Sequence, residues 1–369
     1  DYGRSDVILV WGGNLIYSGG PQGRLQKILD AQKRGASLVV IKPEQQPDAA
    51  KADLWAPIRP GADCALALAM LHVIITERLH DRDFVANWCY GFEALSSHIR
   101  EYTPEWAASI TGLSADLIKR LARLYGKARS GCIITGNAFD QTINSNNAVR
   151  AVAALIAVTG NLDRPGGNIV PTGSTMPRVK PVTPWELFSP DLVEKLVAPE
   201  VPKAFQPFIE GPSSAYYKCL ESVLTRDPYP VRSILAPGTQ PPVSTRNPRR
   251  VIEALEKVDF FATIDVMENA AMPWADVVVP VASMYECDHP FEATGNWIMA
   301  RNKVVEPLGD YKSDYEFWLD LGVWMGYGDY FWQGSIERCM NYQLENFGLT
   351  MEELREHPAG LVYESKPME

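Results

Sequence analysis

The chain has 369 residues, of which 46% are hydrophobic, and its formal net charge at pH 7 is −10. This composition predicts a globular protein of two or three domains, and the lack of a Lys/Arg-rich run in the sequence argues against nucleic acid as a partner. The longest apolar stretch, Cys64 to Ile75, is shorter than the ~20 residues that a membrane span needs, so no span is predicted in this chain.

The first elements predict a parallel α/β lobe. A strand over 7–11 ends in Gly12-Gly13-Asn14, a helix is expected over 25–34, and a second strand is expected over 38–41. Continuous apolar strands that alternate with amphipathic helices are typical of a parallel sheet covered on both faces. A ligand of such a sheet lies beyond the carboxyl ends of the strands, where glycine lets a phosphate approach the backbone.

The segment Ala52-Asp53-Leu54-Trp55-Ala56-Pro57 follows, and a helix is then expected over 64–79 with Asp63 at its N-cap. Two interpretations of Asp63 stay open: its carboxylate caps the helix, or it accepts two N–H groups from a guanine edge. Helices with structural roles are predicted over 81–89, 93–101 and 114–127, and a further one begins near Pro104.

A third strand of the same lobe is expected over 131–135, with Gly136 and Gln141 in the turn that follows it. A helix over 146–158 and a Gly-rich loop over 159–168 complete this part. From 171 to 230 the sequence is Pro-rich, with helical patches near 190–197 and 213–224, and is interpreted as a connection between lobes.

The order of the first elements then recurs. A strand over 231–236 runs into Gly238-Thr239-Gln240, a helix over 251–257 precedes a strand over 260–265, and Ala275-Asp276-Val277-Val278-Val279-Pro280 follows. This unequal duplicate predicts two nucleotide-binding lobes. Asp53 and Asp276 hold the same place in the two copies, and they either bind a ligand or turn the chain.

Neither glycine turn matches a standard phosphate-binding pattern. The sequence from Gly12 to Tyr17 fails G-x-G-x-x-G, and the chain contains no P-loop and no H-E-x-x-H. Ordinary NAD binding and P-loop hydrolysis are therefore disfavoured. The six cysteines are dispersed without a C-x-x-C pair, which indicates reduced thiols rather than a zinc or iron-sulfur site in this chain.

Two further features lie in the second half of the chain. His289 follows Glu286 and Asp288, whose carboxylates would favour its protonated form, and it is a candidate for a substrate or proton-relay role, with a loop-stabilising hydrogen bond as the alternative. An aromatic group is interpreted as helix packing rather than as a substrate funnel: Trp318, Trp324, Tyr327, Tyr330, Phe331 and Trp332. One or two closing helices are expected over 335–354.

Four sequence motifs occur in a fixed order: V-I-L-V-W-G-G-N from residue 7, A-D-L-W-A-P-I-R-P-G-A-D from residue 52, T-G-N-L-D-R-P-G-G-N from residue 159, and A-D-V-V-V-P-V-A-S from residue 275. Over about residues 6–326 the chain resembles the large catalytic subunits of the molybdopterin oxidoreductase family, of the dimethyl sulfoxide reductase type. The resemblance implies an α/β fold of two doubly wound, mostly parallel, Rossmann-like lobes. The boundaries expected are 1–170 for the first lobe, 171–230 for the connection, 231–330 for the second lobe and 331–369 for the closing helices.

The resemblance also implies a cofactor, molybdenum or tungsten bis(molybdopterin guanine dinucleotide), with one guanine dinucleotide arm in each lobe. Carried over by position, the first arm would contact Gly12, Gly13 and Asn14 at its pyrophosphate, Lys42 and Asp63 at its guanosine, and Gly136 and Gln141 after the third strand. The second arm would contact Gly238, Thr239 and Gln240 at its pyrophosphate and Asp265 near its guanosine. Asp276, Ser283 and Glu286 lie in the matching stretch.

The chain departs from the family pattern at three places. It has Lys42-Pro43-Glu44 where many members have Asp-Pro-Arg, Ala138 where glycine is frequent, and Asn296 where arginine is common. The family's cofactor contacts at these three places are therefore not carried over to this chain.

The resemblance implies an oxidoreductase in which a metal ligand and the cysteines of a 4Fe-4S cluster precede Asp1, so the chain is interpreted as an internal fragment without turnover of its own. The partners expected are a small-molecule substrate and an iron-sulfur electron-transfer subunit. Two alternatives stay open: a pterin-free scaffold subunit of a respiratory complex, such as the large subunit of NADH dehydrogenase, and a thiamine-diphosphate or CoA enzyme with doubly wound lobes.

Overall fold

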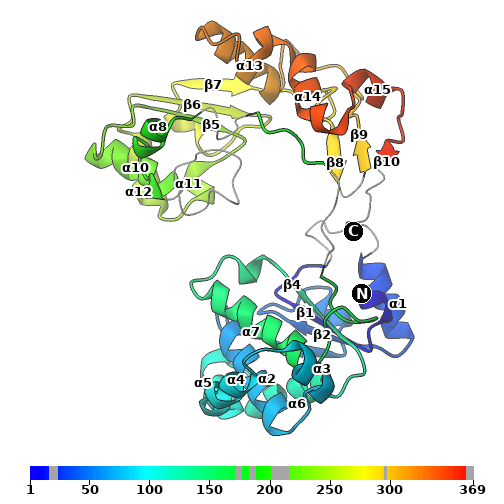
Figure 1. Cartoon of the computed structure of the whole chain (residues 1–369). Helices are drawn as coiled ribbons and strands as arrows, with labels where there is room; N and C mark the ends of the chain where they lie inside the picture. The colour runs from blue at the N-terminus through cyan, green and yellow to red at the C-terminus, as the bar shows by residue number, and fades with distance from the viewer. Residues whose placement is uncertain (16–23, 171–176, 183–187, 201–215, 295–296, 363–369) are drawn as a thin grey trace. The chain divides into compact units, whose positions relative to one another are not determined.

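A computed structural model describes residues 1–15, 24–170, 177–182, 188–200, 216–294 and 297–362 (Figure 1). The chain divides into two compact units, Asp1–Thr172 and Gly173–Glu369. Each unit is built around a parallel sheet, which confirms the predicted α/β class with two doubly wound lobes. The predicted connection, 171–230, begins at the end of the first unit, and its remainder and the predicted closing helices belong to the second unit.

The sheet of the first unit has four parallel strands in the order β3-β2-β1-β4: β1 (Val7–Trp11), β2 (Ser37–Ile41), β3 (Leu54–Ala56) and β4 (Gly131–Thr135). Val7 of β1 lies opposite both Ser37 and Gly131. The chain therefore passes outward from β1 to β2 and β3, and then returns to place β4 on the other side of β1. The order reverses between β1 and β4, and such a switch point is where doubly wound sheets bind ligands.

Helices surround this sheet: α1 (Arg24–Lys33), α2 (Asp63–Thr76), α3 (Arg82–Trp88), α4 (Phe92–His98), α5 (Pro104–Thr111), α6 (Ala115–Gly126) and α7 (Ser145–Val158), with short 3-10 turns η1 (Tyr2–Arg4), η2 (Ala49–Lys51), η3 (Ile99–Glu101) and η4 (Asn137–Phe139). Their starts follow the capping rules. Thr103 accepts the amide of Trp106 ahead of a proline at the first position of α5, and Ser114 accepts the amide of Leu117 at the start of α6.

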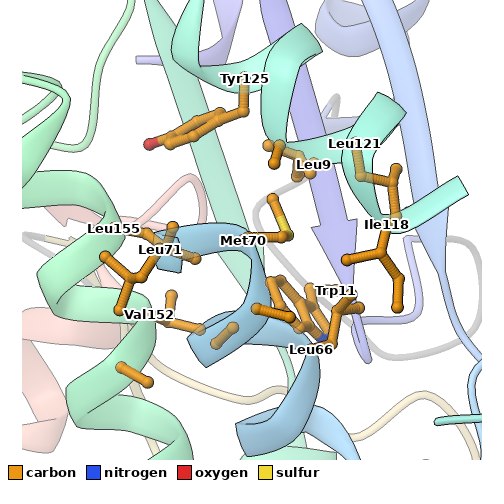
Figure 2. Packing of buried hydrophobic residues seen from close by; sticks show 14 of the residues in the cluster. Leu9, Trp11, Leu66, Met70, Leu71, Ile118, Leu121, Tyr125, Val152 and Leu155 are labelled. Carbon is orange, nitrogen blue, oxygen red and sulfur yellow. The ribbon is translucent and has the colours of Figure 1, made fainter. Parts of the chain in front are cut away.

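Alternate residues of β1 enter two different cores, as the side-chain period of a strand requires. Ile8 and Val10 pack with Ile28 of α1 on one face. Leu9 and Trp11 pack on the other face with helices α2, α6 and α7, in the cluster that Figure 2 shows around Met70. All five residues of β1 are buried, so this strand is covered on both faces and positions the turn that follows it.

The second unit contains a three-stranded parallel sheet in the order β5-β6-β7: β5 (Ser233–Pro237), β6 (Phe260–Asp265) and β7 (Val277–Pro280). The helices that precede or connect these strands are α8 (Pro190–Glu194), α10 (Tyr216–Thr225), α11 (Pro241–Ser244) and α12 (Pro248–Leu255), with the 3-10 turn η7 (Met272–Trp274). Helices α10 and α12 cover one face of the sheet with Leu220, Val251 and Leu255 against Phe261.

A second, antiparallel sheet in this unit was not predicted. It has the order β10-β9-β8, formed by β8 (Glu292–Thr294), β9 (Trp297–Met299) and β10 (Leu361–Val362). Strands of two or three residues are too short to show a period of two, so no sequence pattern indicated them. Around it lie α13 (Asp314–Trp324), η8 (Trp332–Gly334), α14 (Ile336–Leu344), η9 (Glu345–Phe347) and α15 (Met351–Arg355). Asn296 lies outside the described residues.

The repeated Ala-Asp-x-x-x-Pro segment has the same structural role in both units. Asp53 accepts the backbone amide of Leu38 at 2.8 Å, and its own amide donates to the Leu38 carbonyl at 2.9 Å. Asp276 makes the same two hydrogen bonds with Phe261, both at 2.8 Å. Each aspartate thus joins the start of one strand to the start of its neighbour, at the edge opposite the glycine turns, and this geometry favours the chain-turning role over ligand binding.

Candidate functional site

The turns after β1 and β4 meet at the switch point of the first unit. Gly12 has a φ of +66°, and its amide donates to the Ile41 carbonyl at 2.9 Å. A Cβ atom at Gly136 would lie 2.5 Å from the Gly12 carbonyl oxygen and 2.6 Å from the Gly13 Cα. Only glycine lets these backbones approach so closely. The structure therefore brings Gly12, Gly13 and Gly136 together, as the positions at the strand ends predicted.

The departure at Ala138 fits this geometry. A Cβ atom on Gly12 would lie 2.8 Å from the Ala138 Cβ, so the alanine methyl is tolerated because Gly12 carries no side chain. Gln141, three residues after Ala138, is exposed, and its backbone amide donates to the backbone carbonyl of Asn137 at 3.1 Å. Gln141 therefore follows η4 on the same side of the sheet as the glycine turns.

Asp63 is the first residue of α2, and the prediction of an N-cap is wrong. The capping position belongs to Ala62, and no side chain caps the helix. The Asp63 carboxylate instead accepts the indole N–H of Trp11 at 2.8 Å, which ties the start of α2 to the end of β1. Burial raises the pKa of the Asp63 carboxyl group, and the Trp11 hydrogen bond opposes this shift. A buried carboxylate at the strand ends is a strong acceptor for further N–H groups.

Lys42, directly after β2, is engaged inside the protein. Its ammonium group forms an ion pair with Asp48 at 2.7 Å, and the side chains are only 6% and 1% exposed. The Lys42 ammonium also donates to Gln46 at 3.3 Å, and Gln46 in turn accepts the side-chain amide of Asn14 at 3.2 Å. This network joins the turn after β1 to the loop after β2. Asp48 and Gln46 were missed at the sequence level, because only the folded loop brings them to Lys42.

The second unit repeats the turn geometry of the first. Gly238 has a φ of +55°, and its amide donates to the Ile264 carbonyl at 2.8 Å, as Gly12 does to Ile41. No atom lies within 4 Å of where a Gly238 Cβ would be, so this backbone faces open space. The Thr239 hydroxyl is 3.5 Å from that of Ser244, and the Gln240 side-chain oxygen accepts the Ala270 amide at 3.5 Å. The helix α11 that follows has four residues.

Asp265 ends β6, and both of its carboxylate oxygens have protein donors: the Val266 amide and the Asn269 side-chain amide, each at 2.8 Å. Glu286, in the loop after β7, accepts the Ser283 amide at 2.8 Å and the Leu308 amide at 3.3 Å. The hydrogen bonds from Ser283 lower the pKa of the Glu286 carboxyl group. Asp265 and Glu286 therefore hold the loops at the carboxyl ends of β6 and β7.

His289 is buried, and its Nε2 atom forms a hydrogen bond with the hydroxyl of Ser313, the capping residue of α13. Glu316 lies 3.9 Å from the same nitrogen. The expectation that carboxylates favour the protonated ring is wrong, because desolvation by burial outweighs Glu316 and Asp288 and lowers the His289 pKa. The loop-stabilising alternative agrees with this geometry.

The described part of the chain has neither a candidate metal cluster nor a membrane-spanning helix. No cluster of three or more His, Cys, Asp or Glu side chains there is arranged to hold a metal ion. In the same residues, no helix has the length and apolar character needed to cross a membrane.

The family model for molybdopterin oxidoreductases matches residues 1–322. The chain belongs to this family. Membership supports a molybdenum or tungsten pterin as the cofactor. All four ordered motifs of the sequence lie within the matched residues.

Among the curated members of the family, the chain is 30% identical to the "Probable oxidoreductase YoaE" of Bacillus subtilis over 93% of this chain and 48% of that protein. It is 28% identical to the thiosulfate reductase molybdopterin-containing subunit PhsA of Salmonella typhimurium, over 94% of this chain and 47% of that protein. Among solved structures, acetylene hydratase from Pelobacter acetylenicus matches with a TM-score of 0.78 and 26% identity, over 99% of this chain and 53% of that chain. The chain thus spans about half the length of these relatives.

Proposed function

We propose that the chain is part of a molybdenum or tungsten oxidoreductase whose cofactor is bis(molybdopterin guanine dinucleotide), and that each unit binds one guanine dinucleotide arm. The observation that carries this proposal is the repeated turn. Gly12 and Gly238 both adopt positive φ and donate to Ile41 and Ile264 of the neighbouring strand at 2.9 and 2.8 Å. Two equivalent turns at the carboxyl ends of parallel strands suit two equivalent phosphate groups.

The donor and acceptor chemistry of the first unit fits such an arm. The close approach of Gly136 to Gly12 leaves a turn without side chains for a pyrophosphate. Asp63 is a buried carboxylate that could receive the N–H groups of a guanine edge in addition to that of Trp11. Lys42 and Asp265 are already bonded to protein groups, and in this proposal they position the loops at the guanosine ends.

The bound metal would supply two-electron redox or oxo-transfer chemistry, and the chain would supply binding and orientation. The names of the relatives point to a small-molecule substrate: thiosulfate, formate or acetylene. A 4Fe-4S cluster and an iron-sulfur partner subunit are part of the same proposal for the whole protein, and iron content is their first check.

The test is made on the full-length parent protein, purified without oxygen from molybdate- and tungstate-supplied cells. We expect molybdenum or tungsten by elemental analysis and two equivalents of GMP per metal after acid release. One equivalent would overturn the two-arm assignment. Protein without metal and without GMP would identify the alternative, a pterin-free scaffold.

A pair of glycine variants tests whether the turn at Gly136 binds the nucleotide. Gly136→Ala should reduce the GMP content sharply, because the added Cβ would lie 2.5 Å from the Gly12 oxygen. Gly309→Ala is the matched control, since its Cβ would meet the Tyr311 ring at an ordinary 3.6 Å. Equal GMP content in the two folded variants would contradict the assigned turn.

A further inference from the structure

The second unit contains a cavity of about 800 Å³ whose lining has no Lys, Arg, Asp or Glu among the described residues. Its volume is within the range of small-molecule sites, ≈ 300–1,000 Å³. Seven aromatic side chains of the described residues line it: Phe188, Tyr315, Trp318, Tyr327, Tyr330, Phe331 and Trp332. The interpretation of the aromatic group as helix packing was thus incomplete. Five of its members share this cavity, and Trp324 is 88% exposed elsewhere on α13.

The floor of the cavity is buried and uncharged. Leu319 of α13 and Cys339 of α14 are 3% and 2% exposed. Burial raises the pKa of the Cys339 thiol to about 11, and it also raises the pKa of the Tyr315 hydroxyl. Both groups are therefore neutral at physiological pH, and they can offer a hydrogen bond without a charge.

The aromatic residues that line the cavity form its aromatic wall, and one of them, Trp332, lies in a strained stretch of backbone. Trp332 and Gln333 both adopt positive φ, +49° and +53°, although neither is glycine. Gln333 fixes the preceding loop, since its amide donates to the Gly328 carbonyl at 2.8 Å and its side chain donates to Asp329 at 2.7 Å. Consecutive residues in this conformation are costly, and such strain clusters at ligand sites.

Gly322 on α13 leaves the space that the Phe331 ring occupies. A Cβ atom at Gly322 would lie 2.3 Å from the Phe331 ring, so the ring rests against the helix backbone at this position. Trp332 is in turn packed against Tyr342 of α14, with ring centroids 5.2 Å apart. The Phe331 and Trp332 rings are therefore held in place by contacts with α13 and α14.

We propose that this aromatic cavity binds an uncharged small molecule with one or two flat rings and one polar substituent. Flat rings gain from stacked and edge-to-face contacts with the seven aromatic side chains. A charged ligand would lose its hydration without a counter-ion, which is costly in an apolar site. Tyrosine hydroxyl and tryptophan N–H groups on the wall can bond a single polar atom. This site does not depend on the nucleotide-binding turns.

The test uses the full-length parent protein and 2-naphthol, with binding measured by isothermal titration calorimetry. We expect saturable binding in the micromolar range, and weakening of roughly five- to tenfold in Trp318→Ala, as the loss of one aromatic contact predicts. Trp324→Ala is the matched control on the same helix and should bind like the wild type. Because Trp318→Ala could unfold, Tyr330→Ser supplies a second variant at a side chain that is 68% exposed.

Three results would overturn the proposal. No saturable binding to the parent protein would mean that the cavity is filled by another part of it. Equal affinity of the Trp324→Ala variant and both cavity variants would place 2-naphthol elsewhere. Equal affinity for the charged analogue 2-naphthoate would contradict the preference for uncharged ligands, which should amount to roughly tenfold or more.

Discussion

The side-chain amide of Asn168 makes the two hydrogen bonds to Ile133 that a neighbouring strand would make. Its oxygen accepts the Ile133 amide and its nitrogen donates to the Ile133 carbonyl, both at 2.9 Å. Asn161 of the same Gly-rich loop accepts the Gly131 amide at 2.8 Å. The loop over 159–168 therefore covers the outer edge of β4. This structural role accounts for the motif T-G-N-L-D-R-P-G-G-N, to which no ligand contact was assigned.

Asn168→Ala should lower the free energy of unfolding by about 1–3 kcal/mol, because the amide and the carbonyl of Ile133 lose their partner together. Urea titration followed by circular dichroism measures the loss. Asn87→Ala is the control, since the Asn87 side chain is exposed and bonds only the Asp83 carbonyl of its own helix. Equal effects in the two variants would show that the loop does not stabilise β4.

Asp53→Ala and Asp276→Ala should each lower the free energy of unfolding by about 0.5–1.5 kcal/mol, because each removes the carboxylate that binds the neighbouring strand. The metal and GMP content of the folded parent protein should not change, since both residues lie at the edge opposite the glycine turns. Asp310→Ala serves as the control, as no hydrogen bond to its side chain occurs within the described residues. Loss of cofactor from a stable Asp53→Ala or Asp276→Ala variant would show instead that the aspartate binds the cofactor.

Lys42→Met should lower the free energy of unfolding by about 3–5 kcal/mol, because Asp48 would stay buried without its counter-charge. The double variant Lys42→Met/Asp48→Leu should recover most of this loss. Lys33→Met breaks the exposed pair with Asp30 and should cost far less than Lys42→Met, because solvent screens an exposed pair. The same urea titration compares them, and a double variant as unstable as Lys42→Met would contradict a buried pair.

The buried His289 predicts a pH dependence of stability. Its pKa in the folded chain lies below the unfolded value of about 6.5, so the unfolded chain takes up a proton first as the pH falls. The free energy of unfolding should therefore decrease as the pH falls through about 6.5, and less so in His289→Gln. Unfolding titrations between roughly pH 8 and pH 5 measure this, with the exposed His357→Gln as control. Identical slopes in all three proteins would contradict it.

Local patterns in the sequence determined the α/β class, the duplication and the glycine turns. Buried parallel strands are continuous apolar runs, as in β1 and β6, and a turn with positive φ needs glycine, as at Gly12 and Gly238. These signals lie within a few neighbouring residues, so they can be recognised before any tertiary contact is known. The order of four such motifs also sufficed to indicate the family.

Only the tertiary structure decided which polar groups meet. Asp63 was predicted to be a helix cap from its place just before an apolar helix. Its actual partner, the Trp11 indole, is 52 residues away in sequence and reaches the carboxylate only in the folded chain. The charge of Lys42 looked available for a ligand until the loop brought Asp48 to it. The antiparallel sheet and the aromatic cavity likewise depend on packing between distant segments. Side-chain partners are set by three-dimensional proximity and burial, which carry no period in the sequence.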